Sequence, residues 1–157
     1  MVRACRYALA GQLGALAALL AVEVLPFGPE IAASALRLAC GFEAVGYGAG
    51  GLVAVAGWGL GRPLPERVVR AGLSLVLLGL GVRHTLLVAD PMAGDPALSA
   101  PSTWAVALVV WAALLRAGAR RGVVEEASWA VRGGWLVGIS VVGLVNTLAM
   151  ATVRTMV

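Results

Sequence analysis

Long apolar runs joined by short connections constrain this chain more than any other feature. Hydrophobic residues make up 61% of its 157 residues and charged residues only 13%, whereas soluble domains are typically about 45–50% apolar and about 25% charged. Between the runs there is no stretch long enough for a separate soluble domain. We therefore predict an all-α, polytopic integral membrane protein that forms a single transmembrane domain.

Five apolar segments can be delimited, and a spanning helix needs about 17–25 such residues. The first, third and fifth segments fit this length. The second is too long to cross the membrane untilted and the fourth is short, so four spans with a re-entrant or interfacial fourth segment are the alternative. The segments cover residues of about 7–25, 31–60, 65–89, 101–115 and 129–153. We expect the first to be a retained helix, because it exceeds the 7–15 residues of a typical signal-peptide core.

Arginine sets the expected orientation, and all 12 basic residues are arginine. With a cytoplasmic N-terminus, nine arginines lie on the inner side and only Arg154 outside, as the positive-inside rule demands. The nine are Arg3, Arg6, Arg62, Arg67, Arg70, Arg116, Arg120, Arg121 and Arg132. We predict a plasma (inner) membrane location, in a bacterium on the hint of the arginine-only, alanine- and glycine-rich composition, and we expect no nucleic-acid partner.

The second segment carries a glutamate on a stripe of small residues. Its glycines fall near Glu43 on a helix of 3.6 residues per turn and form small-xxx-small pairs, which allow close helix approach in lipid. These glycines are Gly46, Gly50, Gly57 and Gly61, and the later segments offer Gly72, Gly79, Gly134 and Gly138 for helix packing.

A matching charge lies in the third segment. Glu43 is 18 residues from Gly61 and Arg83 is 18 residues from Pro65, so both should lie roughly 27 Å from the inner ends of their helices. We therefore expect an antiparallel hairpin to pair Glu43 with Arg83. The favoured interpretation is a structural staple, since pairing reduces the free-energy cost of a charge in the membrane. The alternatives are a polar path in which Glu43 changes protonation, and snorkelling of either side chain to the interface.

Other polar residues fall at similar depth and could converge on an intramembrane cluster. Each alone is more typical of a structural role, and the single histidine excludes bis-histidine haem ligation within one copy. The full candidate cluster is Glu23, Arg37, Glu43, Arg83, His84 and Asn146. The basic group Arg116, Arg120 and Arg121 is interpreted first as a topology signal; anionic lipid or a cytoplasmic partner are the alternatives.

No phosphate-binding loop, dinucleotide fingerprint, zinc spacing or nucleophile motif occurs. We accordingly expect no enzyme activity, no cofactor and no metal. The favoured function is a non-enzymatic subunit that packs into a larger membrane complex. The alternative is a small oligomeric transporter or channel that uses Glu43 paired with Arg83.

Overall fold

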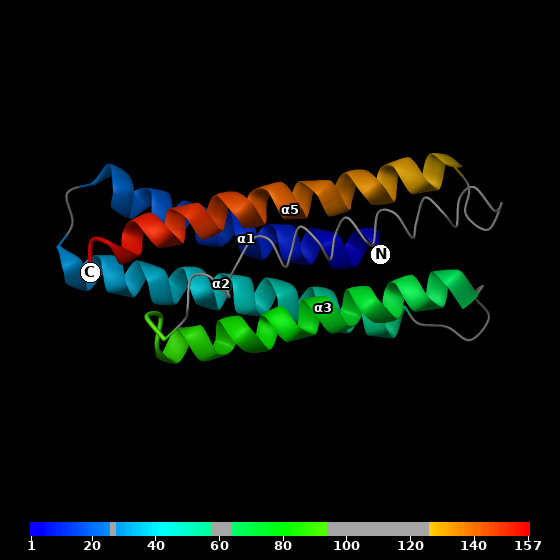
Figure 1. The fold of residues 1–157 in the computed structure, drawn as a ribbon, viewed down its shortest axis with the longest axis horizontal. Coiled ribbons are helices and arrows are strands. Elements are labelled where there is room, and N and C mark those ends of the chain that lie inside the picture. Colours follow the sequence, from blue (N-terminus) through cyan, green and yellow to red (C-terminus); the bar gives the residue numbers. More distant parts are fainter. Residues whose placement is uncertain (26–27, 58–63, 94–125) are drawn as a thin grey trace.

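The computed structural model describes residues 1–25, 28–57, 64–93 and 126–157. This part of the chain contains four helices and no strand (Figure 1). They are α1 (Val2–Val24), α2 (Pro29–Ala56), α3 (Leu64–Ala89) and α5 (Glu126–Arg154).

All four helices are long and apolar enough to cross a membrane. The prediction of helices is therefore confirmed for the first, second, third and fifth segments, and their length and composition are compatible with a membrane protein. The fourth segment, residues 101–115, and with it the count of five, lies outside the described residues.

The second helix ends earlier than the sequence suggested. Its N-terminus follows the expected turn, with Gly28 extended and Pro29 in the first helical turn, where a missing N–H is harmless. Its C-terminus is at Ala56 instead of near residue 60, and the N–H of Gly57 closes it on the carbonyl of Val53. The φ of Gly57 is −81°, which any residue can adopt, but a Cβ at this position would meet Nη1 of Arg70.

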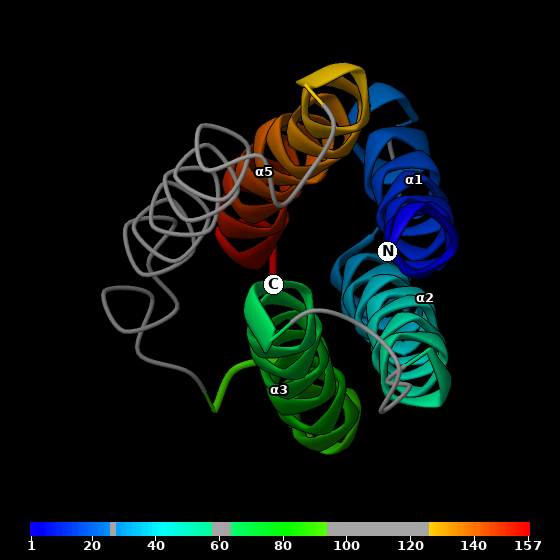
Figure 2. The ribbon, with the colours of Figure 1, turned by 90° about the vertical axis from the view of Figure 1, so that its right-hand side faces the viewer.

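Seen end-on, the four helices follow an arc in the order α5, α1, α2, α3 (Figure 2). Consecutive helices of this arc pack along one another, whereas α3 and α5 do not. The two chain ends lie at opposite ends of the bundle (Figure 1), which we call the Met1 end and the Val157 end. The bundle therefore has α1 and α2 as its packed seam, with α3 and α5 attached on either side.

Glycine brings α1 and α2 into backbone contact. A Cβ at Gly46 would lie 2.6 Å from the Cα of Gly11, and one at Gly50 would lie 2.7 Å from the carbonyl oxygen of Ala4. Gly81 of α3 is similarly close to Gly48, where a Cβ would lie 3.0 Å from the backbone nitrogen. Larger side chains at these positions would force the helices apart.

The other glycines predicted for helix packing have different surroundings. Within the described part of the chain, no atom lies within 4 Å of a Cβ built at Gly79, Gly134 or Gly138. Gly72 is half-buried, and Gly61 lies outside the described residues.

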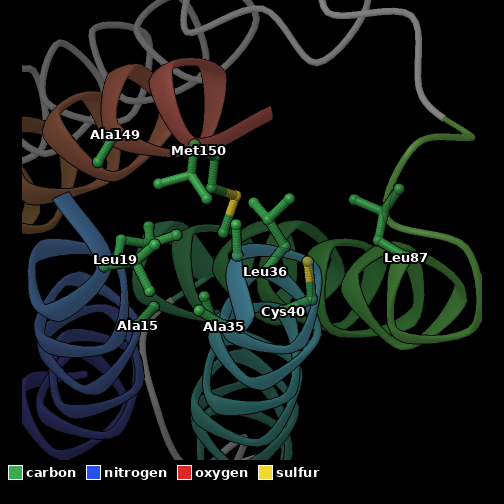
Figure 3. Close-up of a cluster of buried hydrophobic side chains, with 12 residues drawn as sticks. Ala15, Leu19, Ala35, Leu36, Cys40, Leu87, Ala149 and Met150 are labelled. Carbon is green, nitrogen blue, oxygen red and sulfur yellow. The ribbon is translucent and has the colours of Figure 1, made fainter. Parts of the chain in front are cut away.

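Two clusters of buried apolar side chains hold the arc together. The cluster near the Val157 end draws side chains from all four helices, among them Leu19, Leu36, Leu87 and Met150 (Figure 3). The cluster near the Met1 end also uses all four, including Ala8, Leu77 and Ile139. In each helix the residues of one cluster are separated from those of the other by a buried polar residue.

Candidate functional site

Those separating residues, together with Tyr47 of the cluster near the Met1 end, form a polar network in the interior of the bundle. Every described helix contributes to it, and none of its residues is more than 8% exposed. We call this set the core network; it comprises Gln12 of α1, Glu43 and Tyr47 of α2, His84 of α3 and Asn146 of α5.

The centre of the core network is a carboxylate–imidazole pair. His84 Nε2 lies 2.8 Å from Glu43 Oε2. The other imidazole nitrogen, Nδ1, lies 2.9 Å from the carbonyl oxygen of Leu80. A carbonyl only accepts hydrogen bonds, so Nδ1 carries a hydrogen and the second imidazole nitrogen faces the carboxyl group.

This geometry assigns a proton to the contact between His84 and Glu43. Without it, an imidazole lone pair would face a carboxylate at 2.8 Å, which is repulsive. With it, the pair is either imidazolium and carboxylate or imidazole and carboxylic acid, and both forms have no net charge. Among apolar helices a neutral pair is favoured over a charged one, because an isolated buried charge is costly.

The other carboxyl oxygen of Glu43 is bound from two different helices. Asn146 Nδ2 donates to Oε1 at 2.9 Å and also to the backbone carbonyl of Gln12 at 2.8 Å. Tyr47, one turn along α2, directs its hydroxyl to the same oxygen at 3.5 Å, and its ring lies 5.3 Å from that of His84. Thus Oε2 links α2 to α3, and Oε1 links α2 to α5.

Gln12 connects α1 to this arrangement and leaves an oxygen unpaired. Its Nε2 donates to the Tyr47 hydroxyl at 2.8 Å and to the carbonyl of Ile139 at 3.0 Å. The amide orientations are fixed because each nitrogen faces a carbonyl, which can only accept. Two buried acceptors, Gln12 Oε1 and Asn146 Oδ1, therefore have no hydrogen-bond partner among the described residues. Gly143 makes room for the glutamine, since a Cβ there would lie 2.8 Å from its Nε2.

The expected pairing of Glu43 with Arg83 is wrong by one residue. The ion pair of Glu43 in the described part of the chain is with His84, and Arg83 is half-buried on the adjacent side of α3. The difference has two causes. Helix α2 ends at Ala56, so the depth of Glu43 counted from residue 61 is too large, and α3 turns a different face toward α2 than the sequence predicts. The face of α3 that meets α2 carries Gly81 and His84, not the stripe that ends in Arg83.

The other predicted cluster residues are placed apart from the core network. The structure brings together Glu43, His84 and Asn146, whereas Glu23 and Arg37 are exposed on the outside of their helices. Arg116, Arg120 and Arg121 lie outside the described residues.

The cluster predicted from the sequence does not contain two members of the network, Tyr47 and Gln12. Tyr47 is one helical turn from Glu43, a spacing that places both on one face. Gln12 is the single amide in the apolar run of the first segment, and an amide in such a run is a signal for interhelical hydrogen bonding.

Metal ligands do not gather in the described residues, where no group of three or more histidine, cysteine or acidic side chains could hold an ion. Comparisons of the chain with protein-family models, with curated proteins and with solved structures give no match. The core network itself offers hydrogen bonding and a close contact between a carboxyl group and an imidazole.

Proposed function

We propose that this chain is a small, non-enzymatic membrane transporter or channel that conducts protons, with the Glu43–His84 pair as its proton-binding site. The observation that carries the proposal is the 2.8 Å contact between a carboxyl group and an imidazole, buried at the middle of four apolar helices. Ionisable residues inside a membrane cost at least about 2.5–3.5 kcal/mol by insertion scales and commonly mark proton pathways.

Unpaired acceptors in the core network support a functional role beyond stapling. Purely structural polar networks are favourable when every member is hydrogen-bonded. Here Gln12 Oε1 and Asn146 Oδ1 are buried beside the proton-sharing pair and have no partner in the part of the chain that the structure describes. Oxygen atoms of this kind accept hydrogen bonds from water, which is the carrier that a proton needs to reach or leave Glu43.

The two oxygens of Glu43 offer a way to link protonation to helix position. Oε2 holds α3 through His84, and Oε1 holds α5 through Asn146, while α3 and α5 do not pack along one another. A change in the proton count of the pair alters both contacts at once. Uptake of a second proton gives the pair a net positive charge and loss of the shared proton gives a net negative one, and either change disfavours the buried arrangement.

The proposal is tested with purified protein in lipid vesicles that contain a pH-sensitive dye. After an external acid pulse, vesicles with the wild-type chain should acidify faster than empty vesicles. Glu43→Gln should return the rate to that of empty vesicles, because glutamine cannot release a proton. Glu23→Gln is the matched control, since Glu23 is exposed outside the core network, and it should conduct like wild type.

Either of two results would refute the proposal: wild-type vesicles that acidify no faster than empty ones, or a Glu43→Gln variant that conducts like wild type. Circular dichroism and gel filtration of each variant establish that the folded protein is being compared.

A second candidate is a structural subunit of a larger membrane complex, and it is supported by the open glycine positions. A Cβ at Gly79 of α3, or at Gly134 or Gly138 of α5, would meet no neighbouring side chain or helix in the described part of the chain. A helix of another chain could pack closely against such positions. Purification in mild detergent separates the candidates. A stable complex with other chains and no proton conduction would favour the subunit.

A further inference from the structure

A cavity at the Met1 end of the bundle has the lining of an anion-binding site. Its volume is about 670 Å³, within the range of small-molecule sites, and all four described helices contribute to its wall. Arginine comes from three of these helices: Arg3 from α1, Arg70 from α3 and Arg132 from α5. Tyr7 and Val53 give the same cavity an apolar side.

Positive charge exceeds negative charge in the described residues around this cavity. Arg70 and Arg132 share one carboxylate oxygen of Glu66, at 3.2 and 3.5 Å from it respectively. Arg3 is exposed at the rim and adds a further positive charge. Among the described residues, the three arginines that line the cavity thus outnumber the one glutamate that pairs with two of them, so the charge there is net positive.

Arg70 is held in place by contacts that leave part of its guanidinium unused. One terminal nitrogen donates to the carbonyl of Gly57 at 3.2 Å and the other pairs with Glu66. Its Nε is buried and has no hydrogen-bond partner among the described residues. The arginine is 8% exposed overall, so its position is set by the fold before any ligand arrives.

We propose that this cavity binds a phosphate-bearing anion, with the headgroup of an anionic phospholipid as its source. Guanidinium groups bind phosphate oxygens through paired, charge-assisted hydrogen bonds. The arginines supply that contact, and the apolar side formed by Tyr7 and Val53 accommodates the glycerol and the start of an acyl chain. Soluble phosphate shares the anionic chemistry but not the apolar contact, so the two sources can be separated.

The test uses the full chain in a neutral detergent, with phosphatidylglycerol, phosphatidylcholine or inorganic phosphate added in parallel. Native mass spectrometry counts bound lipid and thermal unfolding reports stabilisation. We expect phosphatidylglycerol to remain bound at several-fold higher occupancy than phosphatidylcholine and to raise the unfolding temperature. Inorganic phosphate should raise it less and should compete only at high concentration.

Arg132→Gln and Arg3→Gln should each reduce phosphatidylglycerol occupancy several-fold. Arg3 is exposed and serves as the variant least expected to disturb folding. Arg37→Gln is the matched control: it removes an exposed arginine from α2 outside the cavity lining and should leave occupancy unchanged.

Equal occupancy by the two lipids, or an equal loss in all three variants, would overturn the proposal. A different result is that inorganic phosphate alone stabilises the protein, and that Arg3→Gln and Arg132→Gln abolish this effect while Arg37→Gln does not. The cavity would then still be an anion site, but its ligand would be a soluble phosphate and the lipid proposal would be wrong. The outcome is independent of proton conduction, because the cavity lining and the core network share no residue.

Discussion

Two pairs of ionisable side chains, one in the core network and one at the Met1 end, differ in how far they are exposed and in how close the partners lie. In the core network, Glu43 is 3% exposed and lies 2.8 Å from His84. At the Met1 end, Glu66 is 14% exposed and lies 3.5 Å from Arg132, whose side chain is 21% exposed. The deeper contact is shorter and has no solvent to replace a lost partner. The energetic consequence of removing one partner should therefore differ severalfold between the two sites.

The largest effect is expected when the core pair loses its imidazole. His84→Leu leaves the carboxyl group of Glu43 without its partner in an apolar interior. Breaking a buried pair in this way costs about 3–5 kcal/mol. Urea or detergent unfolding of the purified variant, followed by tryptophan fluorescence, measures the loss. A loss below about 1 kcal/mol would mean that the core pair is no different from a surface pair.

The second effect tests whether Glu43 is energetically coupled to His84 or to Arg83. Glu43→Leu combined with His84→Leu should recover much of the loss caused by either change alone, because the unpaired group is removed. The same glutamate change combined with Arg83→Leu should give losses that add. These two double-mutant cycles, measured as free energies of unfolding, compare the coupling of Glu43 to two neighbouring residues of α3. Coupling with Arg83 but not with His84 would restore the pairing expected from the sequence.

A third change tests whether close packing of α1 against α2 is what keeps the core network buried. Gly46 lies one turn from Glu43, and a Cβ there would meet the backbone of Gly11. Gly46→Ala should therefore lower stability by about 1–3 kcal/mol, as overpacking does. Gly134→Ala is the control, because its Cβ would meet no atom of the described residues. Equal unfolding midpoints for the two variants would show that the α1–α2 seam is not closely packed.

The smallest effect is expected at the Met1 end. Arg132→Gln removes a partly exposed charge and should lower stability by less than about 1 kcal/mol. Its effect should also shrink at about 1 M salt, where the screening length is about 3 Å, whereas that of His84→Leu should not change. Unfolding of the two variants at low and at high salt measures the loss of stability of each and its dependence on salt. A salt-insensitive loss of several kcal/mol at Arg132 would erase the distinction between the two regions.

The sequence predicted the helices well because length and apolar composition decide membrane-spanning segments with little help from tertiary contacts. Four of the expected segments are helices that could span a membrane. The end of α2 was misplaced by several residues because glycine-rich sequence between Ala56 and Pro65 is compatible with a helix or a turn. Local composition does not decide between them.

The site was harder to predict because it depends on how helices face one another. Glu43 was identified as a buried charge since its residue type is rare in an apolar run, but its partner depends on the rotation of α3, which one residue shifts by about 100°. Two faces of α3 each offered glycine and a basic residue, one ending in Arg83 and the other in His84. The backbone contact between Gly81 and Gly48 selects the second, and no pattern within one helix reveals it.

One measurement tests the central claim that Glu43 and His84 share a proton. The chain has a single histidine, so nitrogen magnetic resonance of protein labelled at histidine reports His84 alone. We predict a protonated Nδ1, an Nε2 resonance shifted by its hydrogen bond to the carboxyl group, and loss of that shift in Glu43→Gln but not in Glu23→Gln. A His84 spectrum that is identical in wild type and Glu43→Gln would contradict the account.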